Sequence, residues 1–322
     1  MKGFRGLAVG AAIAVYAQVV LGGVVRITGS GLGCPDWPAC QGHLVPDFAN
    51  SRVVIEYAHR LIGTVAGLLM LATAVVAVIL YTRRPTAGVT ALPRGLVAAA
   101  LAGVGLIVVQ GILGGITVLM GNNPFTVAIH LGNALLVLGA ALLVALWAGG
   151  VAAPDDRPSQ PERTGPLFPG LVYGSLGAAF AIVVSGAYVV GAGASAACSG
   201  WPLCGAATRT PATDIHYLHR VVVLMAGLVI LWTVGHARRR WRRTPLAAAV
   251  YGCALLFVVE VGIGAAQVLL HLPEVLRAAH LALATAVWMA VVLMASAYWL
   301  ETRTQVAREP AQATALREAA AR

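Results

Sequence analysis

Charged residues are scarce in this chain. Asp, Glu, Lys and Arg together make up 11% of its 322 residues, whereas apolar residues make up 59%. The mean hydropathy is +0.83. Soluble domains carry about a quarter charged residues, so the scarcity excludes a soluble globular domain and predicts an integral membrane protein.

The apolar runs also lack the two-residue alternation of a membrane β-barrel, which indicates helices that satisfy their own backbone in lipid. A span needs about 20 residues. The first run has no convincing small-residue cleavage site, so we interpret it as a retained helix rather than a signal peptide. Eight spans are predicted, at residues 7–25, 57–81, 95–119, 126–148, 167–190, 216–235, 245–270 and 276–300.

Basic residues are rare on one side of these spans. With eight spans both termini lie on the same side, and the segments of that side hold 16 of the 22 Lys and Arg residues. The positive-inside rule then places both termini in the cytoplasm of a multi-pass plasma-membrane protein. The same bias and attraction to anionic lipid account for the net charge of +10, so we expect membrane lipid and no nucleic acid as a partner.

The chain divides into two similar halves. Residues 1–150 and 167–300 each hold four spans, joined by a linker rich in Pro, Gly and charge at 151–166 and followed by a polar tail at 301–322, expected to be frayed or weakly helical. Three segment pairs correspond: CPDWPAC (34–40) with CSGWPLC (198–204), 55–70 with 215–230, and 109–119 with 259–269. The predicted fold is therefore all-α, with eight transmembrane helices in two pseudo-symmetric four-helix bundles.

Four histidines occupy repeat-related positions, His59 with His219 and His130 with His280, near the outer ends of their helices. One such histidine alone would more simply be an interfacial residue bonded to backbone. Four in register favour metal ligation, because intramembrane ionisable residues are costly. Haem iron with a histidine on each face fits better than a four-histidine zinc site, which would pull both repeats to one point. His216, one turn before His219, is an alternative ligand.

Arginines gather near these histidines. Arg60 and Arg220 directly follow His59 and His219, and Arg26 and Arg277 lie at the same outer level. Guanidinium groups pair well with carboxylates, so they are candidate partners of haem propionates. Snorkelling to the interface is the alternative, and for Arg26 and Arg277 it is equally good.

Only five cysteines occur, and four of them form two close pairs. Cys34 with Cys40 and Cys198 with Cys204 lie in outer loops, where disulfides persist, so two intraloop disulfides are predicted. They could be structural, or the first pair could exchange with thiols. Cys253 lies within a span, without a partner, and is predicted to be a small core residue.

The ensemble resembles the bacterial heme A synthase family over residues 7–300. The matching features are Glu-x-x-His-Arg at 56–60, His-x-x-His-Arg at 216–220, His130, His280 and the two cysteine pairs. The resemblance implies conversion of heme O to heme A, for cytochrome oxidase, by successive hydroxylations of a ring methyl and loss of water to give a formyl group. It implies substrate heme between His59 and His130 in residues 1–150, and a heme B cofactor between His219 and His280 in residues 167–300.

The same resemblance implies partners. Cys34 and Cys40 would exchange with thiol-disulfide proteins, and heme O synthase would be a partner that supplies the substrate. The electron donor and the oligomeric state stay open.

Glu56 is where the two halves differ, since His216 replaces it in the second half. A carboxylate three residues from His59 shares its helix face and could shuttle protons or stabilise positive charge at the oxidised methyl carbon. A first-turn helix-dipole contact is the alternative.

Two other functions compete. A di-haem cytochrome that only relays electrons would need the same four histidines but no difference between positions 56 and 216. A transporter built on a parallel repeat would need a polar midplane site. Its only notable candidates, Gln110 and Glu260, look more like helix-packing or haem-contact residues.

Overall fold

The chain folds as a bundle of long helices. The computed structural model describes residues 2–83, 92–149, 167–205, 208–240 and 246–320, and within them it contains eight α-helices and no β-strand. All eight are long and apolar enough to cross a membrane, which confirms the predicted fold class. They are α1 (Lys2–Ile27), α2 (Ser51–Thr82), α3 (Arg94–Leu119), α4 (Pro124–Ala148), α5 (Leu167–Gly191), α6 (Pro211–Arg240), α7 (Leu246–Leu269) and α8 (Glu274–Ala320).

Several helices begin earlier than hydropathy predicts. Helix α2 starts at Ser51 rather than near residue 57, because the side chain of Asn50 caps it by accepting a hydrogen bond from the backbone N–H of Arg52 at 2.9 Å. Helix α4 begins in the same way with Asn123. Such polar first turns satisfy free backbone N–H groups but lower the local hydropathy, so an apolar window misses them. The predicted linker 151–166 lies outside the described residues.

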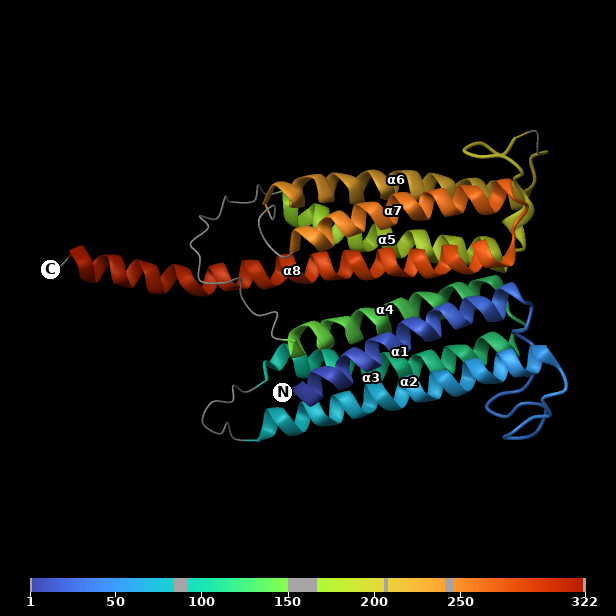
Figure 1. Ribbon diagram of the computed structural model, residues 1–322, viewed down its shortest axis with the longest axis horizontal. Helices are drawn as coiled ribbons and strands as arrows, with labels where there is room; N and C mark the ends of the chain where they lie inside the picture. The colour runs from blue at the N-terminus through green and yellow to red at the C-terminus, as the bar shows by residue number, and fades with distance from the viewer. Residues whose placement is uncertain (1, 84–91, 150–166, 206–207, 241–245, 321–322) are drawn as a thin grey trace.

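Helix α8 is longer than predicted. It continues past the expected end of the span, near residue 300, to Ala320, and it projects beyond the bundle in Figure 1. The tail was expected to be frayed or weakly helical. Its many Ala, Gln, Glu and Arg residues have high helix propensity and favour the helix, although Pro310 within it removes one backbone hydrogen bond.

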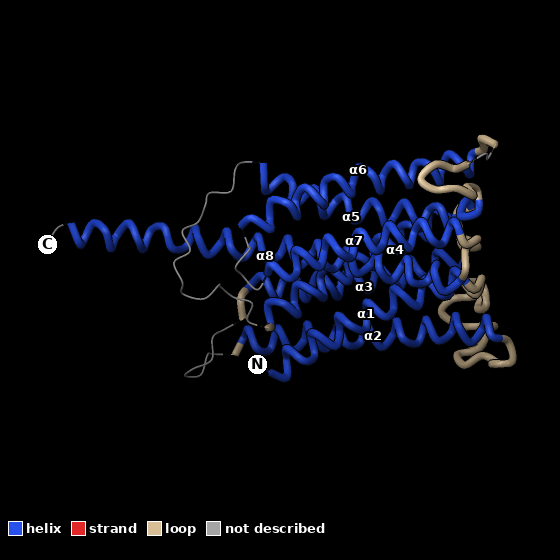
Figure 2. The backbone as a smooth tube through the Cα atoms, turned by 45° about the horizontal axis from the view of Figure 1, so that its top comes forward, coloured by secondary structure: helices blue, strands red, loops and turns tan. Residues whose placement is uncertain are grey.

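The helices form two four-helix groups. In the first, α1 packs on α2 and α4, and α3 packs on α2 and α4; α5 to α8 repeat this pattern in the second. The groups meet through α1 and α4 on one side and α5 and α8 on the other. Figures 1 and 2 show all eight helices running along one axis, with both termini at one end and the loops before α2 and α6 at the other. The even number of spans in each half therefore gives the halves the same orientation, as predicted.

Close contacts and hydrogen bonds between described residues join the halves. The hydroxyl group of Tyr16 donates to the carbonyl of Ala282 at 3.1 Å, and the indole N–H of Trp288 donates to the carbonyl of Leu135 at 2.9 Å. Small residues admit close approach, because a side chain at Gly23 would collide with Leu281. Packing and interhelical hydrogen bonds drive association where lipid removes the hydrophobic gain. The two halves are thus one packed unit.

We expect Trp288→Ala to destabilise the bundle by about 3 kcal/mol, because it opens a cavity and removes a hydrogen bond between the halves. Trp288 is 6% exposed, whereas Trp232 on α6 is 58% exposed. Trp232→Ala is therefore the matched control and should change stability by less than about 1 kcal/mol. The measurement is reversible unfolding in mixed micelles. Equal effects of the two substitutions would contradict the assigned interface.

Candidate functional site

The four repeat-related histidines lie at matching depths in the bundle. His59 and His219 come eight residues after the first residue of α2 and α6, and His130 and His280 come six residues after the first residue of α4 and α8. At 1.5 Å per residue these positions are roughly 12 Å and 9 Å from the helix starts. All four helices start at the end that carries the disulfide loops. The structure therefore brings the four imidazoles to one level of the bundle.

Each imidazole packs against a glycine of the preceding helix. A Cβ atom at that glycine would lie only 2.9–3.2 Å from Cε1 of the histidine, closer than side chains normally allow. The pairs are Gly22 with His59, Gly114 with His130, Gly186 with His219, and Gly264 with His280. The glycines thus allow each ring to lie directly on the neighbouring helix backbone. The sequence analysis did not predict this four-fold pairing.

A polar side chain also faces each ring. The amide nitrogen of Gln18 lies 3.0 Å from Nδ1 of His59, and the amide nitrogen of Gln110 lies 3.2 Å from Nε2 of His130. In the second half, the closest polar atoms to the rings are oxygens. Ser185 Oγ lies 2.9 Å from Nδ1 of His219, and Glu260 Oε1 lies 2.8 Å from Nδ1 of His280.

Two of these four partners were visible in the sequence. Gln110 and Glu260 are repeat equivalents and were interpreted as packing or haem-contact residues, and the structure places both against a histidine ring. Gln18 and Ser185 were missed. A single polar residue in an apolar span was the available signal, but its partner depends on how the helices are rotated.

The four histidines line one cavity of about 810 Å³, within the usual range of about 300–1,000 Å³ for ligand pockets. Its wall is mainly apolar and draws on both halves. Within the described residues, no three His, Cys, Asp or Glu side chains come together as a metal cluster. That arrangement does not support the four-histidine zinc alternative, whereas two pairs of imidazoles suit a flat metal macrocycle ligated on both faces.

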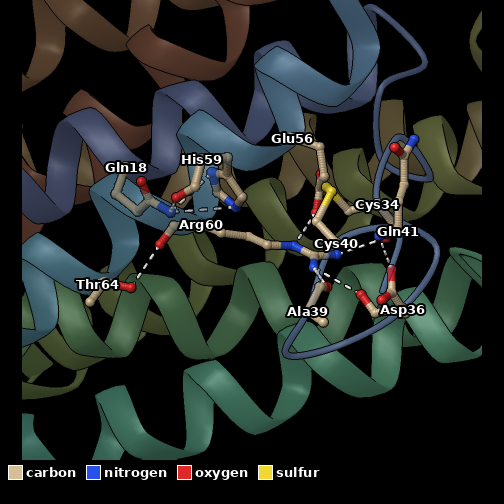
Figure 3. A network of polar contacts seen from close by, with 10 residues as sticks. All are labelled: Gln18, Cys34, Asp36, Ala39, Cys40, Gln41, Glu56, His59, Arg60 and Thr64. Atoms are coloured by element: carbon tan, nitrogen blue, oxygen red, sulfur yellow. Dashed lines mark hydrogen bonds and ion pairs between the residues drawn. A yellow bond between two sulfur atoms is a disulfide. The ribbon is translucent and has the colours of Figure 1, made fainter. Parts of the chain in front are cut away.

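Glu56 and Arg60 form the most extensive polar network at the cavity wall (Figure 3). Arg60 Nε donates to Glu56 Oε1 at 3.0 Å. Its Nη1 donates to the carbonyls of Asp36 and Ala39 at 2.8 and 2.7 Å, and its Nη2 donates to the carbonyl of Cys34 at 2.8 Å. Four of the five guanidinium N–H groups are thereby used. Arg60 therefore fixes the first disulfide loop to α2.

The same loop is held from within by Asp36. Its carboxylate accepts the backbone N–H groups of Gly42 and Gln41 at 2.8 and 2.6 Å. These hydrogen bonds, with that of Gly42 foremost, hold the pKa of the Asp36 carboxyl below its ordinary value. The hydrogen bonds therefore favour the ionised carboxylate, which helps to hold the loop.

The other arginines at this level are less engaged. Arg220 Nη1 donates to the carbonyl of Pro202 at 2.8 Å, while its buried Nη2 has no partner among the described residues. The buried Nε of Arg26 likewise has no hydrogen bond within the described part of the chain. Arg26 and Arg277 come from different halves and line the same cavity. Arg26 and Arg220 therefore have buried N–H groups free for an anion, and Arg60 has little capacity left.

Position 56 separates the two halves chemically, as the sequence indicates. Glu56 is 4% exposed and lines the cavity. Because α2 begins at Ser51, Glu56 lies in the second turn, so the first-turn dipole interpretation does not apply. His216, its counterpart, is 6% exposed and directs Nδ1 to the carbonyl of Ala194 at 3.1 Å. The two residues are both buried at the wall but carry different chemistry.

Both predicted disulfides are present. Cys34 is bonded to Cys40, and Cys198 is bonded to Cys204. Cys253 is a buried free thiol in α7, as predicted for a core residue. The two loops thus share their covalent closure, although the first is held by more arginine hydrogen bonds than the second.

Comparison with known proteins agrees with this architecture. The family model of COX15-CtaA, cytochrome oxidase assembly protein, matches residues 5–292. A heme A synthase of Symbiobacterium thermophilum is 31% identical over 296 residues, which is 89% of this chain and 93% of that protein. A heme A synthase of Geobacillus kaustophilus is 29% identical over 83% of each chain, and one of Alkalihalophilus pseudofirmus is 31% identical over 70% of this chain and 75% of its own length. A match that runs from the first span into the eighth shows that this membrane protein belongs to the COX15-CtaA family of cytochrome oxidase assembly proteins.

Proposed function

We propose that the chain is a heme A synthase, an oxidoreductase that converts the ring methyl of heme O to the formyl group of heme A for cytochrome oxidase. The observation that carries this proposal is the set of four imidazoles at one level, each on a glycine, around a single cavity. The named relatives supply the reaction class. The structure supplies the candidate residues.

The residues present fit two haems. Imidazole is a common axial ligand of haem iron, and the glycines give each ring room beside the neighbouring helix. We assign His59 and His130, in residues 1–150, to the substrate heme O. We assign His219 and His280, in residues 167–300, to a resident heme B, which when bound supplies one-electron transfer. Arg26, Arg220 and Arg277 would face anionic propionates.

Glu56 is the candidate catalytic residue. Its carboxylate is buried at the cavity wall and fixed at Oε1 by Arg60. Oxidation of a methyl group removes protons and builds positive charge on the carbon, and a fixed carboxylate can accept a proton or stabilise that charge. The apolar wall excludes water, which strengthens such interactions. His216 stands at this position in the half that would only pass electrons.

The orientation in the membrane follows from charge. The end that holds both termini carries the excess of basic residues, so it would face the cytoplasm. The Cys34–Cys40 and Cys198–Cys204 loops would then lie outside, where disulfides persist. Thiol-disulfide proteins and heme O synthase are the proposed partners, with Cys34 and Cys40 as the exchanging pair.

A di-haem cytochrome that relays electrons is the second candidate, because it would use the same four ligands. Extraction of haems from the purified full chain, followed by chromatography, separates the two functions. Heme B together with heme O or heme A supports the synthase. Heme B alone, at two per chain, supports the relay, and a preparation without haem would exclude both.

We predict that Glu56→Ala and the isosteric Glu56→Gln both retain haem but abolish formyl production, because neither can accept a proton or carry the charge. The measurement is chromatography of extracted haems, which should show heme O without heme A. Glu274→Gln, at the exposed start of α8, removes the same charge away from the cavity and should leave heme A output unchanged. Normal output from Glu56→Gln would exclude a catalytic role.

We also predict that Gly264→Leu prevents haem binding in the second half, since a Cβ atom there would lie 2.9 Å from Cε1 of His280. The matched control is Gly262→Leu, two residues earlier on α7, where a Cβ atom would meet nothing within 4 Å. The haem-to-protein ratio should fall by about half in the first variant and stay unchanged in the second. A full haem complement in Gly264→Leu would contradict the assigned site.

A further inference from the structure

We propose that the polar residues behind the four histidines decide which half exchanges its haem and which half keeps it. Amide donors face the rings of the first half, and oxygen acceptors face the rings of the second. This inference rests on the proposed function and deepens it. It makes Gln18, Gln110, Ser185 and Glu260 positioning residues.

The amide of Gln18 has a fixed orientation. Its Nε2 donates to the backbone carbonyl of His59 at 2.8 Å, which only the nitrogen of the amide can do. The same nitrogen lies 3.0 Å from Nδ1 of His59. It also lies 3.4 Å from Nε2 of His59. The second N–H group of Gln18 therefore faces the ring nitrogens as a donor and competes with a metal for a ring lone pair.

The orientation of the Gln110 amide is also fixed, by a hydrogen bond to its oxygen. Asn133 Nδ2 donates to the carbonyl of Leu106 at 3.0 Å and to Oε1 of Gln110 at 2.7 Å. The amide nitrogen of Gln110 is thereby directed to Nε2 of His130 at 3.2 Å. Nδ1 of His130 is buried without a hydrogen bond within the described residues. The N–H group of Gln110 thus competes with iron for the same lone pair.

The second half presents oxygens instead. Ser185 Oγ lies 3.0 Å from the carbonyl of Ile182 and 2.9 Å from Nδ1 of His219. We assign its proton to the carbonyl, which leaves Oγ as the acceptor for Nδ1. Glu260 Oε1 lies 2.8 Å from Nδ1 of His280. Neither Nδ1 of His280 nor the carboxylate of Glu260 makes a hydrogen bond of normal geometry within the described residues, but an ionised carboxylate at this distance can only accept one. With haem bound, both rings would carry their proton on Nδ1, which leaves the Nε2 lone pair for a metal.

These two arrangements have opposite effects on ligation. A hydrogen-bond acceptor on the second ring nitrogen fixes the tautomer and raises the basicity of the ligating nitrogen, which strengthens the bond to the metal. A donor on a ring nitrogen weakens the ligand. A substrate that must leave as product suits the weaker ligands, and a permanent electron carrier suits the stronger ones.

The repeat lets one substitution test each half. Gln110 and Glu260 are 150 residues apart, the same offset as His130 and His280, so each can be given the side chain of the other. The variants are Glu260→Gln and Gln110→Glu in the full-length protein, with Glu274→Gln as the charge control. Two readouts are used: transfer of each haem to excess apomyoglobin, and the midpoint potential of the resident haem.

We expect Glu260→Gln to release heme B at least about tenfold faster, the usual effect of losing such a partner. Loss of the anionic acceptor should also raise the midpoint potential. If the substitution weakens binding of ferric haem tenfold more than binding of ferrous haem, the midpoint potential rises by about 59 mV. Gln110→Glu should release heme O or heme A about tenfold more slowly, and Glu274→Gln should change neither value.

The outcomes distinguish failure of this inference from failure of the proposed function. If Glu260→Gln and Gln110→Glu both bind two haems and both show wild-type transfer rates and midpoint potential, the inference is overturned and the proposed function stays intact. A wild-type protein without heme B would overturn both. If Glu260→Gln does not accumulate, Ser185→Ala must speed release of heme B in the same direction, and an unchanged rate there would refute the proposal.

Discussion

The contact between an imidazole ring and a bare glycine backbone is the constraint on which the site depends. It occurs four times, always between a histidine at one level and the helix that precedes it in the chain. Because the glycine has no Cβ, the ring can lie against one helix while the cavity remains open on its other side. A larger residue would push the ring into the cavity. The absence of a Cβ atom at the glycine therefore permits both the close helix packing and the open cavity.

The two halves share their helix arrangement but differ in the chemistry of individual side chains. Helix order, the glycine contacts, the histidines and the disulfide loops are shared by the halves. The differences include side chains at the cavity wall and behind the rings: Glu56 against His216, and Gln110 against Glu260. A fold that is repeated in this way keeps two sites at one depth while their local chemistry diverges.

Much of this was accessible from the sequence because membrane helices follow simple rules of length, charge and hydropathy. The eight spans, the parallel repeat and the two disulfides were predicted correctly, and the repeated histidines lie around one cavity. Gln18 and Ser185 could not be found, since a lone polar residue in an apolar span reveals a partner only when the rotation of two helices is known. The early start of α2 was hidden by its polar first turn, which is why Glu56 looked like a first-turn residue.

Arg60 was interpreted from the sequence as an anion partner, with snorkelling to the interface as the alternative. In the structure it joins three carbonyls of the first disulfide loop to a helix, one residue after His59. These hydrogen bonds couple the loop mechanically to the outer end of α2. Force applied to the loop, by a docking protein or by opening of the Cys34–Cys40 bond, would reach His59, the proposed iron ligand, through a single peptide unit.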